Sequence, residues 1–75
     1  MEHYRNLNGN SDVLSYEIGR DSIEVEFRDG SLYLYNYATT GQTIVDHMKA
    51  LAIAGSGLNS FISKTVRKAY AAKLR

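Results

Sequence analysis

Apolar residues divide the chain into a strand-forming first half and a helix-forming second half. Apolar and polar side chains alternate in residues 14–18 and 23–28. Leucines alternate with tyrosines in residues 32–35, and Tyr37 continues the tyrosine positions. Because successive side chains of a strand point to opposite faces, this period is typical of strands that bury one face. The pairs Arg20-Asp21 and Asp29-Gly30 lie between the runs and predict tight turns. The first half therefore predicts a three-stranded antiparallel meander.

The pairing of the second and third strands decides which side chains form the core. Asp29-Gly30 is typical of a two-residue hairpin loop, and such a loop places Val25 opposite Leu34. On this register the predicted core face comprises eight side chains: Leu14, Tyr16, Ile18, Ile23, Val25, Phe27, Leu32 and Leu34. The opposite face of the third strand then carries three rings that we expect to point away from the core, those of Tyr33, Tyr35 and Tyr37.

The second half predicts two amphipathic helices. The apolar stripe of the first helix consists of Ile44, Val45, Met48, Leu51 and Ala52. Thr40 or Thr43 is expected to cap its start, and Gly55 is expected to end it. After a short link, a second apolar stripe spans residues 58–69.

These elements predict an α+β domain in which both helices pack on the apolar face of the meander. A length of 75 residues is enough for one domain. Residues 1–11 are turn-rich and predict an irregular lead-in, so the domain proper covers residues 12–75. The polar start, the lack of cysteine and the lack of an apolar run of membrane-spanning length predict a cytoplasmic protein without a membrane partner.

Charge is distributed unevenly along the chain. Residues 1–45 carry seven acidic and three basic side chains, whereas residues 46–75 carry six basic and one acidic. On the predicted second helix, three of the basic residues lie opposite the apolar stripe: Lys64, Arg67 and Lys68. Such an arc can contact phosphates without reading sequence. A solvated helix surface explains the same residues, and both interpretations stay open.

The tyrosine face has three interpretations. An exposed aromatic ladder can stack unpaired bases, as RNA-binding sheets do. The rings can instead cover one another and the N-terminal segment, or they can form an interface between protein copies. Glu24 and Glu26 are expected beside Tyr33 and Tyr35, and the basic arc is expected on the other side of the domain. A single site that uses both features is therefore awkward on this arrangement.

The sequence predicts neither catalysis nor a bound cofactor. Asp46 and His47 are neighbours on a helix, so their side chains do not face each other. Two histidines without cysteine do not provide the ligands of a typical metal site. Glu24 and Glu26 share a strand face, but they are expected on an open sheet without a cleft and are interpreted as solvated charge.

Short motifs between Val13 and Val66 resemble the KTSC domain, a small module found at the C-terminus of some lysyl-tRNA synthetases and as a stand-alone bacterial protein. The matching segments are I-G-x-D at residues 18–21, IEVEFRDGSLYLY at residues 23–35, and Gly55 followed by LNSFI at residues 58–62. The Y-x-Y of Tyr33 and Tyr35 is similar to the central motif of that family. The resemblance implies no established activity, although RNA binding has been suggested for the family.

We therefore expect a small, non-catalytic binding module. The lead interpretation is weak binding of RNA or another nucleic acid, through the basic residues Lys64, Arg67 and Lys68 and the tyrosines at positions 33, 35 and 37. The alternative is a homodimer or a complex with another protein through the tyrosine face.

Overall fold

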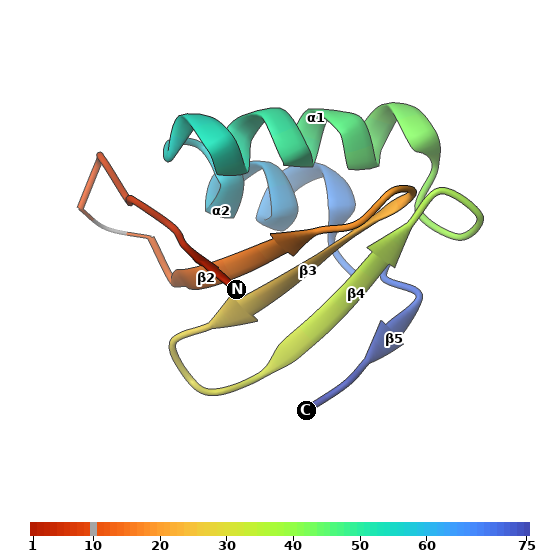
Figure 1. The fold of residues 1–75 in the computed structure, drawn as a ribbon, viewed down its shortest axis with the longest axis horizontal. Helices are drawn as coiled ribbons and strands as arrows, with labels where there is room; N and C mark the ends of the chain where they lie inside the picture. Colours follow the sequence, from red (N-terminus) through yellow and green to blue (C-terminus); the bar gives the residue numbers. More distant parts are fainter. Residues whose placement is uncertain (10) are drawn as a thin grey trace.

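The fold is built on a five-stranded antiparallel sheet whose strand order, β1-β2-β3-β4-β5, follows the chain. The structure is a computed structural model that describes residues 1–9 and 11–75, so Asn10 of the predicted lead-in lies outside the described residues. The strands are β1 (Glu2–His3), β2 (Val13–Ile18), β3 (Ser22–Phe27), β4 (Leu32–Asn36) and β5 (Ala72–Lys73). The helices are α1 (Gln42–Ala54), α2 (Leu58–Phe61) and the π-helical segment η1 (Ile62–Val66). All of the helices lie on one face of the sheet, which we call the helix side (Figure 1).

The prediction of an α+β fold is confirmed, but the predicted meander is only the centre of the sheet. The three predicted strands are β2, β3 and β4, and two-residue strands from the chain ends extend both edges. Strand β1 replaces part of the irregular lead-in, with Glu2 opposite Tyr16. Strand β5 pairs with β4 through Ala72 and Lys73. Strands of two residues are too short to produce an alternating pattern, so the sequence gives no signal for either of them.

The loop between β3 and β4 contains three residues, one more than predicted. The Phe27 N–H donates to the Ser31 carbonyl at 2.9 Å, and the Gly30 N–H donates to the Phe27 carbonyl at 3.0 Å. Gly30 has a φ of 90°, the left-handed conformation that ends a three-residue loop with a bulge. The resulting register places Val25 opposite Tyr33, and residues 23 and 35 are likewise paired.

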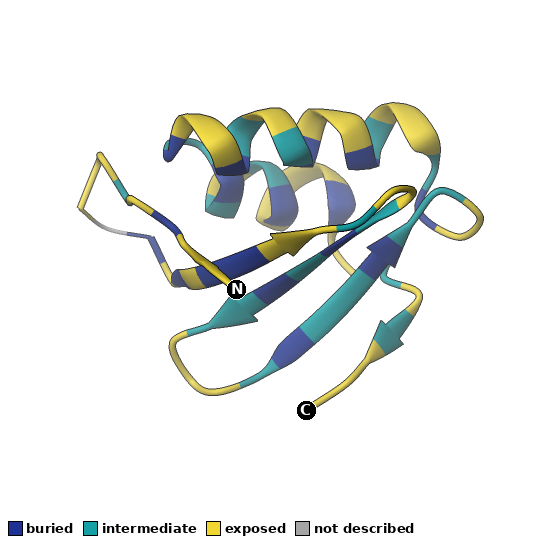
Figure 2. Cartoon of the chain, in the orientation of Figure 1, coloured by how far each residue is buried: buried dark blue, intermediate teal, exposed yellow. Residues whose placement is uncertain are grey.

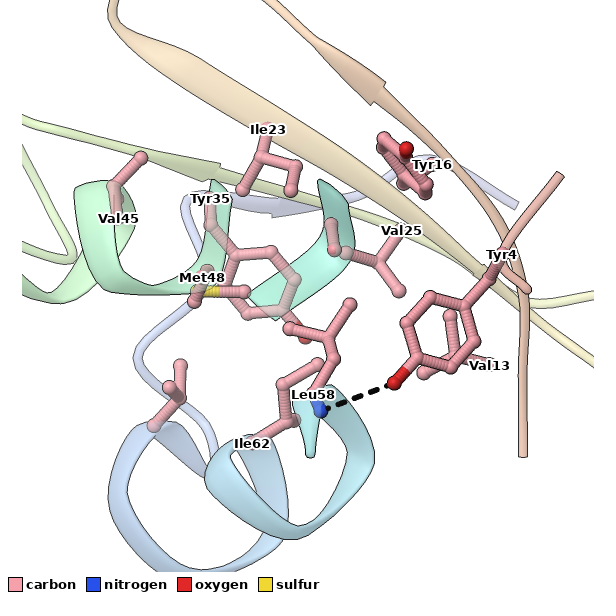
Figure 3. Close-up of a cluster of buried hydrophobic side chains, with 12 residues drawn as sticks. Tyr4, Val13, Tyr16, Ile23, Val25, Tyr35, Val45, Met48, Leu58 and Ile62 are labelled. Carbon is pink, nitrogen blue, oxygen red and sulfur yellow. Dashed lines mark hydrogen bonds between the residues drawn. The ribbon is translucent and has the colours of Figure 1, made fainter. Parts of the chain in front are cut away.

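This change of register inverts the faces of β4, and the prediction that its tyrosines point away from the core is wrong. A one-residue shift moves every side chain of a strand to the other face. Tyr35 is 2% exposed and packs on the helix side in a cluster that includes Val45 and Met48 (Figure 3). Leu32 and Leu34 lie instead on the face that the helices leave open.

Polar side chains cover part of the face that has no helices. Arg75 Nη2 lies 2.6 Å from Glu26 Oε2, and the Ser15 hydroxyl donates to Glu26 Oε1 at 2.6 Å. Leu32 of β4 is paired with Glu26 of β3, so the Arg75 side chain passes over Leu32 to reach the Glu26 carboxylate. Leu32 is only 9% exposed as a result, even though no helix packs on it.

The pairing of β2 with β3 follows the prediction at one end only. Tyr16 lies opposite Val25, and Ile18 lies opposite Ile23, as expected for a two-residue turn. Near the start of β2, a bulge shifts the register so that Val13 lies opposite Phe27. The bulge places Val13 in the core and leaves Leu14 at 38% exposure, so the predicted core position of Leu14 is wrong.

Helix α1 matches its predicted stripe and its predicted end. Val45, Met48 and Ala52 are buried toward the sheet, and the opposite surface of the helix is exposed (Figure 2). Gly55 ends the helix in the left-handed conformation, with a φ of 76°. The helix begins after Gly41, however, and the Thr40 hydroxyl donates to the Ala69 carbonyl at 2.6 Å. The predicted threonine cap is therefore wrong.

The second predicted helix ends earlier than its apolar stripe. The Arg67 N–H donates to the Ile62 carbonyl at 2.6 Å, a wide i to i+5 turn that closes η1. Ahead of α2, the buried Tyr4 hydroxyl accepts a 3.3 Å hydrogen bond from the Leu58 N–H (Figure 3). The N-terminal segment is thus attached to the corner between the helices. Within residues 1–9 and 11–75, none of the helices is both long and apolar enough to cross a membrane.

We expect Gly30→Ala to lower the free energy of unfolding by about 1 kcal/mol, because an L side chain is strained at positive φ. A Cβ at Gly30 meets no atom within 4 Å, so the cost is purely conformational. Gly30→Asn is the matched control and should lose less, because asparagine tolerates the left-handed region. Denaturant unfolding measures both, and equal stability of Gly30→Ala and the parent would contradict the loop assignment.

Candidate nucleic-acid interface

The three ladder tyrosines have separate environments in the structure. Tyr35 is buried in the core and is not accessible to a ligand. The Tyr37 hydroxyl donates to Asp46 Oδ1 at 2.5 Å, and the Lys49 ammonium lies 4.9 Å from the centroid of the Tyr37 ring. Tyr33 and Tyr37 are both half-buried at the edge of the core, and Tyr33 lines a groove. The predicted continuous ladder is therefore absent, and Tyr33 is the member of the ladder that is placed to bind.

Tyr33 lies at the centre of an aromatic cluster drawn from three segments. Its ring centroid is 4.7 Å from that of Tyr70, 5.8 Å from that of Phe27 and 6.5 Å from that of Tyr35. Such separations are typical of favourable aromatic pairs. Tyr70 precedes β5, and the pairing of β5 with β4 brings it onto Tyr33. Tyr70 has no signal in the sequence pattern, because it lies beyond the second helix and is positioned by contacts between distant segments.

An open groove of about 560 Å³ lies at the hairpin end of the sheet. We call it the aromatic groove; it is lined by Asp12, Phe27, Arg28, Asp29, Ser31 and Tyr33. Its volume is in the range typical of small-molecule sites. Two aromatic rings are thus combined with charged groups of both signs in one concave surface.

The charged groups of the aromatic groove differ in how firmly they are held. Asp29 Oδ1 accepts hydrogen bonds from the Ser31 N–H at 2.9 Å and from the Ser31 hydroxyl at 2.6 Å. These bonds hold the pKa of Asp29 below its usual value, so the carboxylate stays ionised. The side chain of Arg28 is exposed, and Lys73 Nζ lies 6.0 Å from the centroid of the Tyr33 ring. The fixed carboxylate of Asp29, the carboxylate of Asp12 and two cations therefore surround the rings.

The predicted basic residues Lys64, Arg67 and Lys68 are all exposed. Arg67 has a φ of 50° and a ψ of −116°, and the Ala69 N–H donates to the Val66 carbonyl at 2.9 Å. These values describe a type II′ turn with Arg67 at the position that favours glycine. The turn leads directly to Tyr70, so part of the basic arc connects to the aromatic cluster.

The inverted register also changes the relation between the aromatic and the basic residues. The predicted two-residue loop would place them on opposite sides of the domain. Directly paired residues of a sheet point to the same face, so Tyr33 shares the helix side with Val25 and Lys73. The aromatic groove and the basic segment after η1 therefore lie on one side of the sheet.

Two of the residues considered for catalysis, Glu26 and His47, make structural contacts. Glu26 is bonded to Ser15 and Arg75 on the open face. His47 stacks on Phe61, with ring centroids 4.4 Å apart and an angle of 9° between the planes. Within the described part of the chain, no group of three histidine or carboxylate side chains is placed to hold a metal ion.

Comparison with protein-family models, with curated proteins and with solved structures gave no match for this chain. The similarity to the KTSC domain consequently rests on the short motifs alone.

The buried phenol of Tyr35 provides a test of this arrangement. Burial, together with the neighbouring phenols of Tyr33 and Tyr70, raises the pKa of Tyr35 to about 12. The ordinary tyrosine pKa is about 10, so the unfolded chain loses this proton at a lower pH than the folded protein. The stabilising effect is therefore complete below about pH 10 and is lost as the pH rises toward 12.

We expect the midpoint of thermal unfolding to fall between about pH 10 and pH 12 more steeply in the parent than in Tyr35→Phe, which has no phenol at this position. Circular dichroism melts at several pH values measure the difference. Parallel curves for the two proteins would show that Tyr35 is not buried as described.

Proposed function

We propose that the chain is a small, non-catalytic module that binds single-stranded nucleic acid weakly through the aromatic groove. The observation that carries the proposal is the combination of Phe27, Tyr33 and Arg28 in one concave surface, with Lys73 beside the Tyr33 ring. Single-stranded nucleic acid combines aromatic bases with regularly spaced negative charge, and sites of this composition suit it. RNA is the preferred form, since the KTSC resemblance points to RNA.

Stacking of a base on Phe27 or Tyr33 costs little conformational entropy of the protein. Phe27 and Tyr33 belong to paired strands, so their backbones are already ordered before a ligand arrives. Stacking of one base on an aromatic side chain contributes about 1–3 kcal/mol. An unpaired base can stack on an aromatic ring, whereas the bases of a duplex are already stacked on one another. The geometry therefore favours a single strand.

Lysine and arginine side chains are available for the phosphates next to such a base. Lys73 lies beside Tyr33, and the turn at Arg67 and Lys68 leads into Tyr70. Phosphate contacts of this kind are independent of sequence and sensitive to salt. Asp12 and Asp29 on the groove wall repel phosphates, which supports a modest affinity.

The backbone of Arg67 supports a binding role for the turn. An arginine at positive φ costs of the order of 1–3 kcal/mol relative to an unstrained residue, and glycine would avoid this cost. Strain of this kind is concentrated at binding and catalytic sites. An exposed arginine in this strained conformation is consistent with a role for its guanidinium outside the fold.

We expect Lys68→Gln and Lys73→Gln each to weaken the binding of a fluorescent single-stranded RNA and to lower the slope of log K against log salt by about 0.7. Fluorescence anisotropy at several salt concentrations measures both effects. The matched control is Arg20→Gln, which removes one positive charge from the β2–β3 turn, at the opposite end of the sheet. This control should bind like the parent.

Absent or salt-independent binding by the parent would contradict the proposal, and so would equal losses for all three variants. Measurement of the solution mass over a range of protein concentrations tests the homodimer alternative. Among the ladder tyrosines, that alternative would have to use Tyr33, because Tyr35 is buried and Tyr37 is bonded to Asp46.

A further inference from the structure

We infer that the aromatic groove selects an unpaired guanine and that Asp12 is the residue that determines this specificity. The inference rests on the proposed function, since it names the base that the bound strand places in the groove. It is drawn from the polar groups on the groove wall, which stacking alone does not require.

A carboxylate beside a stacking platform distinguishes the four bases. The Watson–Crick edge of guanine presents two neighbouring donors, the ring N1–H and the exocyclic amino group, which one carboxylate can accept together. Such charge-assisted, bidentate pairs are stronger than neutral hydrogen bonds. Adenine, cytosine and uracil each place an acceptor next to their Watson–Crick donor, and a carboxylate repels that acceptor. A groove with a free carboxylate therefore favours guanine.

Asp12 is better placed for this role than Asp29. Asp29 Oδ1 already accepts two hydrogen bonds from Ser31. The Asp12 carboxylate lines the same groove, and it has no hydrogen bond or ion pair to any other residue that the structure describes. Its backbone is nevertheless fixed, because the Arg28 N–H donates to the Asp12 carbonyl at 2.8 Å. Asp12 thus combines a fixed position with an unoccupied carboxylate.

Arg28 adds a donor to the same wall. A guanidinium pairs with the O6 and N7 acceptors of guanine, which is the commonest specific contact between a side chain and a base. The groove accordingly offers a carboxylate for the donors of guanine and a guanidinium for its acceptors. One of the two rings stacks on its face and the other meets its edge, because the planes of Phe27 and Tyr33 are 80° apart. No other base has this set of complementary groups.

The test uses short RNA oligonucleotides of uridine with one central nucleotide varied among guanosine, inosine, adenosine, cytidine and uridine. A single guanosine prevents the formation of guanine quadruplexes. We expect the guanosine oligonucleotide to bind about tenfold more tightly than those with adenosine, cytidine or uridine. Inosine keeps N1–H but lacks the amino group, so its affinity should lie between the two.

Asp12→Asn should abolish the preference for guanosine and tighten the binding of the oligonucleotide that contains only uridine, because the variant removes a carboxylate that repels phosphates and the acceptors of uracil. Asp21→Asn is the matched control, because it removes one negative charge at the β2–β3 turn, the other end of the sheet, and should keep the preference. Denaturant unfolding of both variants ensures that folded proteins are compared.

The outcomes separate the inference from the function on which it rests. If none of the oligonucleotides binds, the proposed function itself fails. If all of them bind with equal affinity, single-strand binding stands and guanine selection is overturned. If guanosine is preferred but folded Asp12→Asn keeps the preference, the assignment of specificity to Asp12 is overturned.

Discussion

The hydrogen bond from the Phe27 N–H to the Ser31 carbonyl, together with the left-handed conformation of Gly30, sets the register on which the rest of the structure depends. A three-residue loop pairs β3 with β4 one position away from the two-residue alternative. On this register the rings of β4 face the helices. The buried Tyr35 then fills the space between β4 and α1, next to Val45 and Met48.

The same register creates the candidate site. Helices α1, α2 and η1 cover the centre of the helix side, and the hairpin end of the sheet extends beyond them (Figure 1). Phe27 and Tyr33 lie at this end, where no helix covers the groove that they line. The short strand β5 then brings Lys73 and the preceding Tyr70 to the same rings. One aromatic cluster thus contains both the buried core residue Tyr35 and the rings of the candidate site.

Sequence patterns predicted the positions of the strands and helices better than they predicted which face of each strand is buried. Strand period, helical stripes and Gly55 were sufficient for β2, β3, β4 and α1, because each of these signals is local. The faces of β4 were not predictable in this way. Leucine and tyrosine are both acceptable in a core, and Asp-Gly fits either a two-residue or a three-residue loop. The bulge that moves Leu14 outward depends on pairing with β3 and has no local signal.

The candidate site was predictable in composition but not in arrangement. Tyr33 and the basic residues after Phe61 were identified, whereas the contributions of Tyr70, Lys73 and Asp12 depend on contacts between distant segments. The most direct test of the register is a nuclear Overhauser spectrum of the β3–β4 hairpin. The three-residue loop predicts close α-protons for Glu26 and Leu32, and for Glu24 and Leu34, because these are the pairs without mutual hydrogen bonds. Contacts of Leu32 with Phe27 and of Leu34 with Val25 in their place would contradict the structure and the site built on it.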